Sequence, residues 1–236
     1  MLTISQSTVQ AVEIVLIRHG QPEWTRDGLT VVDPPLTELG HAQADAMAHQ
    51  IWTETFDEIL VSPLERARQT AAPLYAKTRR DEQIDPWLEE IRSPGWHGTP
   101  AERADQAYRE MRERPVDERW HGLDGGESIR DFTERIHEGV SGFLAQRGVG
   151  RIDHALPIWS IAEPGRRIVL VAHAGTNSVT IAHLLGLSAT PWEWDRFVLG
   201  HSSVSRLEAV PVHGGFTFSL TSLSNVEHLA VGQRTR

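Results

Sequence analysis

Short runs of aliphatic residues that stop abruptly at polar or charged side chains recur along the chain. The three clearest runs cover residues 12–17, 56–61 and 167–172. Their length and their content of β-branched residues are typical of strands that are buried on both faces of a parallel sheet. Open α/β sheets bind ligands at the carboxyl ends of their strands, so the residues that follow each run are candidates for a binding site.

Helix signals separate these runs. Thr37 is a candidate N-cap residue, and Ser62 and Ser128 occupy similar positions at the starts of two further helices. Gly186 is placed to end a helix. The predicted helices cover residues 37–52, a segment that starts at Ser62, and residues 101–114, 128–144 and 177–185, and two alternating strands follow at 204–210 and 216–223. This alternation of strands and helices predicts an α/β fold.

No repeat or linker divides the chain, so residues 12–236 are expected to form a single domain that follows a flexible leader, residues 1–11. A strongly charged helical segment with little apolar stripe favours a cap or lid at about residues 92–126. A small apolar island, Ala155–Trp159, interrupts the polar stretch 148–166. The island either packs on the domain or meets a partner chain in a homodimer, and both alternatives stay open.

Composition narrows the classes of function. The chain has 236 residues, and 23 Lys and Arg against 32 Asp and Glu give a net charge of −9. This acidic balance argues against general binding to nucleic acids or anionic membranes, and no apolar run approaches the ~20 residues of a membrane span. The chain has no cysteine, which excludes disulfides, thiol nucleophiles and thiolate metal sites and is compatible with the expected cytoplasmic location.

Basic and imidazole side chains follow the predicted strands. Arg18 and His19 come after the first run, Arg66 lies in the first turn of the helix after the second run, and His173 comes after the third. If the strands are parallel neighbours, these four side chains converge. Phosphate suits the bidentate guanidinium group best, so the sequence predicts a site for a phosphate dianion in an otherwise acidic protein.

The same residues suggest a reaction. A neutral imidazole can attack phosphorus and divide one difficult transfer into two easier steps. The leaving oxygen then needs a proton, which a buried carboxylic acid can supply, and Glu89 and Glu90 both lie in a suitable semi-apolar segment. None of the 12 histidines shows the spacing of a metal site backed by a carboxylate, so we predict neither a metal nor a cofactor.

The order of short motifs resembles the histidine phosphatase superfamily, which contains the cofactor-dependent phosphoglycerate mutases and many phosphatases. The matching motifs are Arg18-His19-Gly20, Leu36–Gly40, Ser62–Thr70, Leu88-Glu89-Glu90, Gly126-Glu127-Ser128 and Val171–Gly175. They extend over about residues 12–229. The resemblance implies a phosphoglycerate mutase-like fold, a three-layer α/β/α sandwich with a mostly parallel central sheet and helices on both faces.

The resemblance also implies a role for each matching residue. His19 corresponds to the histidine that is phosphorylated, and the Leu-x-Glu spacing selects Glu90 over Glu89 as the proton donor. The implied phosphate pocket and substrate-binding residues are Arg18, Gln21, Thr25, Arg66, His173 and Ala174.

Two departures from the family pattern stand out. Many relatives have a threonine and an asparagine where this chain has Pro22 and Thr25. The asparagine normally contacts phosphate, so Thr25 is expected to make that contact less well or not at all. Gly95 falls one residue later after Glu90 than is usual in the family, which bears on the placement of the carboxylate.

The expected function is metal-independent hydrolysis of a small phosphate monoester, of the histidine acid phosphatase type. The mutases carry a long insertion that closes over the site and excludes water, whereas the segment between Trp96-His97-Gly98 and Gly126 is modest. Water would then attack the phosphohistidine, with Glu90 acting as base. The alternatives are a phosphoglycerate mutase-type phosphotransferase and a non-catalytic protein that binds a phosphorylated ligand.

Overall fold

The computed structural model describes residues 12–153 and 155–236, so the predicted leader at residues 1–11 lies outside the described part of the chain. The central sheet contains β1 (Val12–Arg18), β4 (Glu58–Val61), β5 (Val149–Arg151), β6 (Trp159–Ile161), β7 (Arg166–Ala172), β8 (Val204–Val212) and β9 (Gly215–Asn225), and a separate hairpin contains β2 (Thr25–Arg26) and β3 (Leu29–Thr30). The helices are α1 (Glu38–Ile51), α2 (Glu65–Thr78), α3 (Ala101–Glu113), α4 (Ile129–Ala145), α5 (Ala174–Leu184) and α6 (Glu193–Arg196), with short 3-10 helices η1 (Pro86–Leu88), η2 (Glu118–His121) and η3 (Val231–Gln233). Among the described residues, no helix combines the length and the apolar composition that a membrane span requires.

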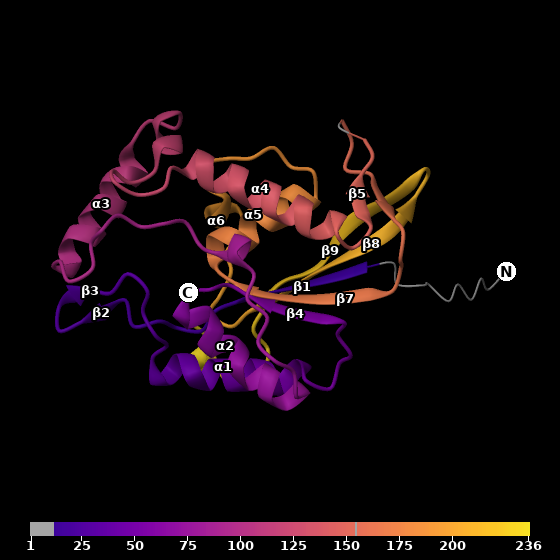
Figure 1. Ribbon diagram of the computed structural model, residues 1–236. Helices are drawn as coiled ribbons and strands as arrows, with labels where there is room; N and C mark the ends of the chain where they lie inside the picture. The colour runs from indigo at the N-terminus through magenta and orange to yellow at the C-terminus, as the bar shows by residue number, and fades with distance from the viewer. Residues whose placement is uncertain (1–11, 154) are drawn as a thin grey trace.

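Helices cover both faces of the central sheet. Figure 1 shows α1 and α2 on one face and α4, α5 and α6 on the other. Side chains alternate along β1 and β7, so Leu16 and Leu170 pack toward α4 and α5, while Val15 and Val169 pack toward α1 and α2. Burial on both faces explains why these strands are continuous apolar runs in the sequence. The predicted α/β/α architecture is confirmed.

The sheet is mixed, with the strand order β4-β7-β1-β8-β9-β6-β5. Strands β4, β7 and β1 are parallel neighbours, so the three predicted runs end at the same edge. All the other neighbours are antiparallel. The expectation of a mostly parallel sheet therefore holds only for the half that carries the three runs. In the other half, β8 and β9 are joined by a tight turn at Gly214, and such turns connect only antiparallel strands.

Two helices start at the predicted N-cap residues, because the caps are local. The Thr37 hydroxyl accepts a hydrogen bond from the backbone N–H of Gly40 at 3.0 Å, and the Ser128 hydroxyl accepts one from the N–H of Asp131 at 3.0 Å. The predicted end of α5 is also confirmed, since Gly186 follows it with a φ of 70°.

Two other helices begin elsewhere than predicted. Helix α2 begins at Glu65 instead of Ser62, because the Asp33 carboxylate, from a distant loop, accepts a hydrogen bond from the N–H of Glu65 at 3.0 Å. The Ser62 hydroxyl lies 2.7 Å from Nε2 of His173 and does not cap the helix. Helix α5 begins directly after His173, three residues earlier than expected.

The apolar island of the stretch 148–166 contributes to the domain's own core. Strands β5 and β6 form a hairpin on the sheet edge, and Trp159 is 1% exposed. Its ring meets that of Phe218 edge-on at 5.5 Å. The hairpin is open to solvent near its tip, where Leu156 is 56% exposed. Of the two alternatives, packing on the domain is therefore observed for Trp159.

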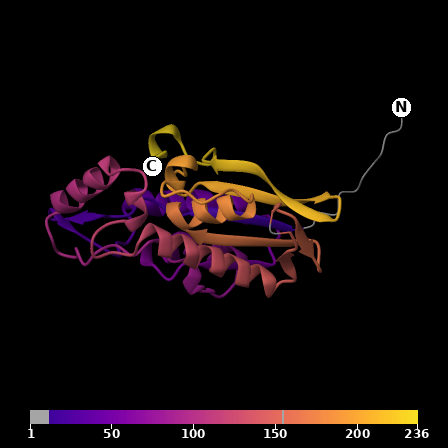
Figure 2. The same ribbon diagram turned by 90° about the horizontal axis from the view of Figure 1, so that it is seen from above.

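The segment 92–126, which contains α3 and η2, lies at one end of the sheet together with the β2–β3 hairpin. Figure 2 shows both at the end opposite the β8–β9 turn. Backbone hydrogen bonds join the two, since the N–H of Thr30 donates to Thr99 at 2.8 Å and the N–H of Gly98 donates to Thr30 at 2.9 Å. These two distant segments thus form one structure beyond the carboxyl end of β1.

A close backbone approach makes Gly40 a sensitive position. A Cβ atom on Gly40 would lie 2.2 Å from the carbonyl oxygen of Gln21, whereas a Cβ atom on Gly142, in the exposed interior of α4, would have no neighbour within 4 Å. We therefore expect Gly40→Ala to lower the free energy of unfolding by about 1–3 kcal/mol. Gly142→Ala is the matched control and is expected to raise it by about 0.5–1 kcal/mol. Urea unfolding followed by circular dichroism measures both, and equal effects would contradict the packing described here.

Candidate active site

Four predicted side chains meet where β1 and β7 end. Arg18 is the last residue of β1 and His19 follows it, while His173 follows β7. The ring centroids of His19 and His173 are 5.1 Å apart. Arg66 enters from the first turn of α2, which begins shortly after β4, the other neighbour of β7. The parallel order of these strands brings together residues that are far apart in the sequence.

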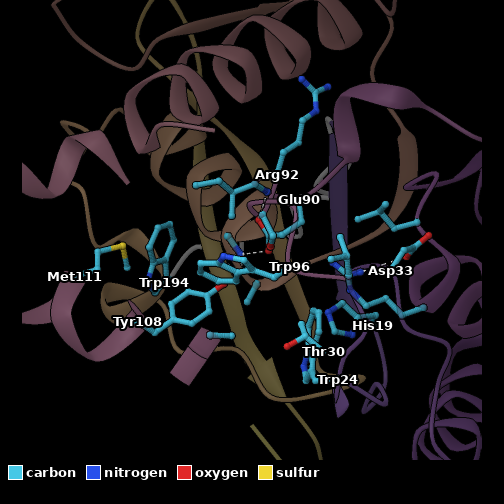
Figure 3. Close-up of a pocket in the computed structure, with 18 of the residues that line it drawn as sticks. His19, Trp24, Thr30, Asp33, Glu90, Arg92, Trp96, Tyr108, Met111 and Trp194 are labelled. Carbon is cyan, nitrogen blue, oxygen red and sulfur yellow. Dashed lines mark hydrogen bonds and ion pairs between the residues drawn. The ribbon is translucent and has the colours of Figure 1, made fainter. Parts of the chain in front are cut away.

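A pocket of about 720 Å³ opens beside His19 (Figure 3). The predicted site residues that line it are Arg18, His19, Thr25, Arg66, Glu90 and Ala174. His173 is 0% exposed and does not reach the pocket surface. Gln21 is turned away, because its Oε1 accepts a hydrogen bond from the Thr37 hydroxyl at 2.9 Å. The position of Gln21 therefore does not support the predicted contact with substrate.

His19 is held as a neutral imidazole with one free nitrogen. Its Nδ1 lies 2.8 Å from the carbonyl oxygen of Gly20. A carbonyl only accepts, so Nδ1 carries the proton and Nε2 keeps its lone pair. Burial lowers the pKa of His19 well below its ordinary value, and the guanidinium groups of Arg66 and Arg18 lower it further. A neutral imidazole with a free nitrogen can act as a nucleophile.

The two arginines have buried nitrogen atoms without a partner. Arg66 is 3% exposed, and its ion pair with Asp33 spans 3.4 Å. Burial lowers the pKa of Arg18 to about 10, which leaves it charged at neutral pH. Among the described residues, Nε of Arg18, Nε of Arg66 and Nδ1 of His173 are buried and have no hydrogen-bond partner. A phosphate anion would satisfy unpartnered donors gathered in one place.

Glu90 presents its carboxylate to the same pocket. Its Oε2 accepts a hydrogen bond from the N–H of Gly175, in the first turn of α5, at 2.8 Å, and its Oε1 accepts one from the N–H of Ile91 at 3.0 Å. Gly175 permits this approach, because a Cβ atom there would lie 2.4 Å from Oε1 of Glu90. The neighbouring Glu89 pairs with Arg92 at 2.9 Å. Although Gly95 falls one residue later after Glu90 than is usual in the family, the carboxylate of Glu90 still lies at the pocket.

The described residues do not include a group of three or more histidine or acidic side chains that could hold a metal ion.

Several known proteins are similar to this chain in sequence. A model of the histidine phosphatase superfamily (branch 1) matches residues 14–221. This chain belongs to that superfamily. It is 31% identical over 194 residues to glucosyl-3-phosphoglycerate phosphatase of Mycobacterium tuberculosis, which covers 78% of this chain and 80% of the relative. It is 25% identical over 215 residues to a probable 2-carboxy-D-arabinitol-1-phosphatase of Arabidopsis thaliana, covering 87% of this chain but only 40% of that protein.

The fold is shared as well. The solved structure of mycobacterial hydrolase 2 superposes with a TM-score of 0.70 at 28% sequence identity and covers 93% of both chains. The family resemblance and the phosphoglycerate mutase-like fold expected from the motifs are both confirmed.

One residue of this histidine phosphatase site, His201, was missed by the sequence analysis. It lies in the loop between α6 and β8, and its ring centroid is 5.8 Å from that of His19. Strand β8 runs antiparallel to β1 with Val204 opposite Ile17, which places this loop beside Arg18. A pairing register of this kind has no signal in a single sequence.

His201 positions Arg18 as a neutral acceptor. One terminal nitrogen of Arg18 lies 3.0 Å from Nε2 of His201, and the other donates to the carbonyl of Leu199 at 2.5 Å. A guanidinium group only donates, so Nε2 of His201 accepts and Nδ1 donates to the Thr235 hydroxyl at 2.8 Å. Burial, with a contribution from Arg18, lowers the pKa of His201 to about 3.

Stability in acid tests this assignment. The unfolded chain protonates His201 below its ordinary pKa near 6.5, but the folded protein does so only near pH 3, so acid favours the unfolded chain in between. We expect His201→Gln to reduce the loss of stability on acidification by up to about 1.4 kcal/mol per pH unit between pH 6 and 4. Urea unfolding across this range measures the slope, and the exposed His41→Gln is the control. Identical slopes in the wild type and in His201→Gln would show that His201 is not buried as a neutral acceptor.

Proposed function

We propose that this protein hydrolyses phosphate monoesters through a phosphohistidine on His19, without a metal ion. The observation that carries the proposal is the free, neutral Nε2 of His19 beside two arginines with unpartnered buried nitrogens. An incoming phosphate dianion would take its hydrogen bonds from Arg18 and Arg66 beside His19. Because the phosphate would then be held beside His19, the attack of the imidazole on phosphorus would become an effectively unimolecular step.

The first half of the reaction transfers the phosphoryl group to the protein. Nε2 of His19 forms a bond to phosphorus while the bond between phosphorus and the ester oxygen breaks. Glu90 gives its proton to the departing oxygen, and the guanidinium groups stabilise the charge on the phosphoryl oxygens. The products are an alcohol and a phosphohistidine.

The second half returns the protein to its starting state. A water molecule attacks phosphorus, Glu90 accepts a proton from that water, and the bond between phosphorus and Nε2 breaks to release inorganic phosphate. The two hydrogen bonds that Glu90 accepts from the backbone N–H groups of Ile91 and Gly175 hold its carboxyl group in place beside the pocket for both half-reactions. Hydrolysis agrees with the identification of the two relatives as a phosphatase and a probable phosphatase.

His19→Ala tests the nucleophile. Without the imidazole no covalent intermediate can form, so we expect kcat on an aryl phosphate to fall by at least about 1,000-fold with the fold intact. The measurement uses excess chelator, in which the wild type is expected to keep its activity. His41→Ala, in an exposed histidine of α1, is the control and should retain activity. Turnover by His19→Ala, or loss of wild-type activity in chelator, would overturn the mechanism.

Glu90→Gln tests the acid. Loss of the proton donor should lower kcat by about 100- to 10,000-fold on alkyl phosphates, whose leaving oxygens need a proton, and by much less on 4-nitrophenyl phosphate. Glu89→Gln is the matched control, because Glu89 pairs with Arg92, and it should change neither rate by more than about threefold. Equal losses on both substrates would remove Glu90 from the role of acid. With 3-phosphoglycerate, release of inorganic phosphate separates hydrolysis from the isomerised product of a mutase.

A further inference from the structure

Beyond the phosphate-binding side chains, the pocket is walled by aromatic and apolar residues. These residues include Trp24, Ile91, Trp96, Tyr108, Met111 and Trp194. Figure 3 shows Trp96, Tyr108, Met111 and Trp194 grouped on the side of Glu90 away from His19 and Asp33. We term the group of Trp96, Tyr108, Met111 and Trp194 the ring wall. The alcohol part of a phosphate ester bound at His19 must lie between the phosphate and the ring wall.

The ring wall is firmly built. Trp96 is 7% exposed, and Tyr108 meets it edge-on with ring centroids 6.2 Å apart. Tyr108 itself is 40% exposed, so much of its ring remains open to the pocket or to solvent. Trp24 continues the wall toward the phosphate, because the Arg66 guanidinium lies 4.8 Å from its ring centroid. A ligand would therefore pass from cationic to aromatic surroundings within one pocket.

The charges around the ring wall do not suit a small hydroxy acid. Such an acid needs a cation for its carboxylate close to the phosphate, where Arg18 and Arg66 are already engaged by the phosphate itself. Arg92 pairs with Glu89, and Figure 3 shows its side chain pointing away from His19 and the ring wall. The other charged residues that line the pocket are of both signs: Asp33, Glu90, Asp105, Arg112, Arg119, Asp195 and Arg236.

We infer that the leaving group of the substrate carries an aromatic or fused ring that stacks on the ring wall. This inference rests on the hydrolysis proposed at His19. The volume of about 720 Å³ falls in the range of about 300–1,000 Å³ typical of sites for ligands much larger than a phosphorylated three-carbon acid. Apolar contact and offset stacking against tryptophan and tyrosine would favour such a ring.

Esters with unactivated alkyl leaving groups test the inference without a bias from leaving-group chemistry. We compare 2-naphthylmethyl phosphate with ethyl phosphate, O-phosphoserine and 3-phosphoglycerate. The naphthyl ester is expected to have a kcat/KM at least about 100-fold above each of the others, with most of the difference in KM. Comparable or higher values for the two hydroxy-acid esters would overturn the inference while leaving the proposed hydrolysis intact.

Substitutions at Tyr108 assign the preference to the ring wall. Tyr108→Ala should lower kcat/KM for the naphthyl ester about tenfold and for ethyl phosphate less than twofold, whereas Tyr108→Phe keeps the ring and should keep the preference. Trp52→Ala is the matched control, since Trp52 is 43% exposed and does not line the pocket. An equal loss on both esters in Tyr108→Ala would show a structural effect and contradict recognition by the ring.

Binding of phosphonates separates this inference from the proposed function. Because a phosphonate cannot be hydrolysed, calorimetry with 2-naphthylmethylphosphonate and ethylphosphonate reads recognition alone. Binding of the naphthyl compound about 100-fold more tightly, in a protein that hydrolyses none of the esters, would support the ring site and reject the phosphatase. Equal affinities would reject the ring site whatever the protein hydrolyses.

Discussion

Two guanidinium groups, those of Arg18 and Arg66, lie at the end of β1, where Arg18 is half-buried and Arg66 is buried, with Glu90 and Asp33 as acidic neighbours. A buried charge is costly unless its hydrogen bonds are satisfied, and here the carbonyl of Leu199 and the ring of His201 satisfy only part of Arg18. Nε of Arg18 and Nε of Arg66 have no hydrogen-bond partner among the described residues, while a terminal nitrogen of Arg66 donates to Asp33 at 3.4 Å. The fold therefore maintains a cationic cavity, and the proposed chemistry of the site follows from that cavity.

The cavity determines the state of its histidines. Burial and the neighbouring cations both disfavour protonation, so the pKa values of His19 and His173 are lowered well below the ordinary value. The hydrogen bond from His19 to Gly20 then selects which nitrogen is free. A neutral imidazole needs no separate base to act as a nucleophile, so in the proposed mechanism the cations that would bind the phosphate also keep the nucleophile unprotonated.

Two glycines, Gly175 and Gly40, allow backbone segments to pack closely around the site. Gly175 lets the first turn of α5 donate to Glu90, and Gly40 lets the start of α1 pack against the residue after Gly20. Segment 92–126 then adds an aromatic wall to the cationic cavity. In a chain with a net charge of −9, Arg18 and Arg66 thus give this one cavity a local positive charge.

The sequence by itself determined the features that depend on near neighbours. Apolar runs predicted β1, β4 and β7, and the caps at Thr37 and Ser128 predicted two helix starts, because strand burial and capping are set within a few residues. The motif order predicted which charged residues belong together, although not how they lie. Only the tertiary structure decided the rest, since it depends on groups far away along the chain: Asp33 sets the start of α2, Thr37 turns Gln21 away from the pocket, and the antiparallel pairing of β8 with β1 brings His201 to Arg18.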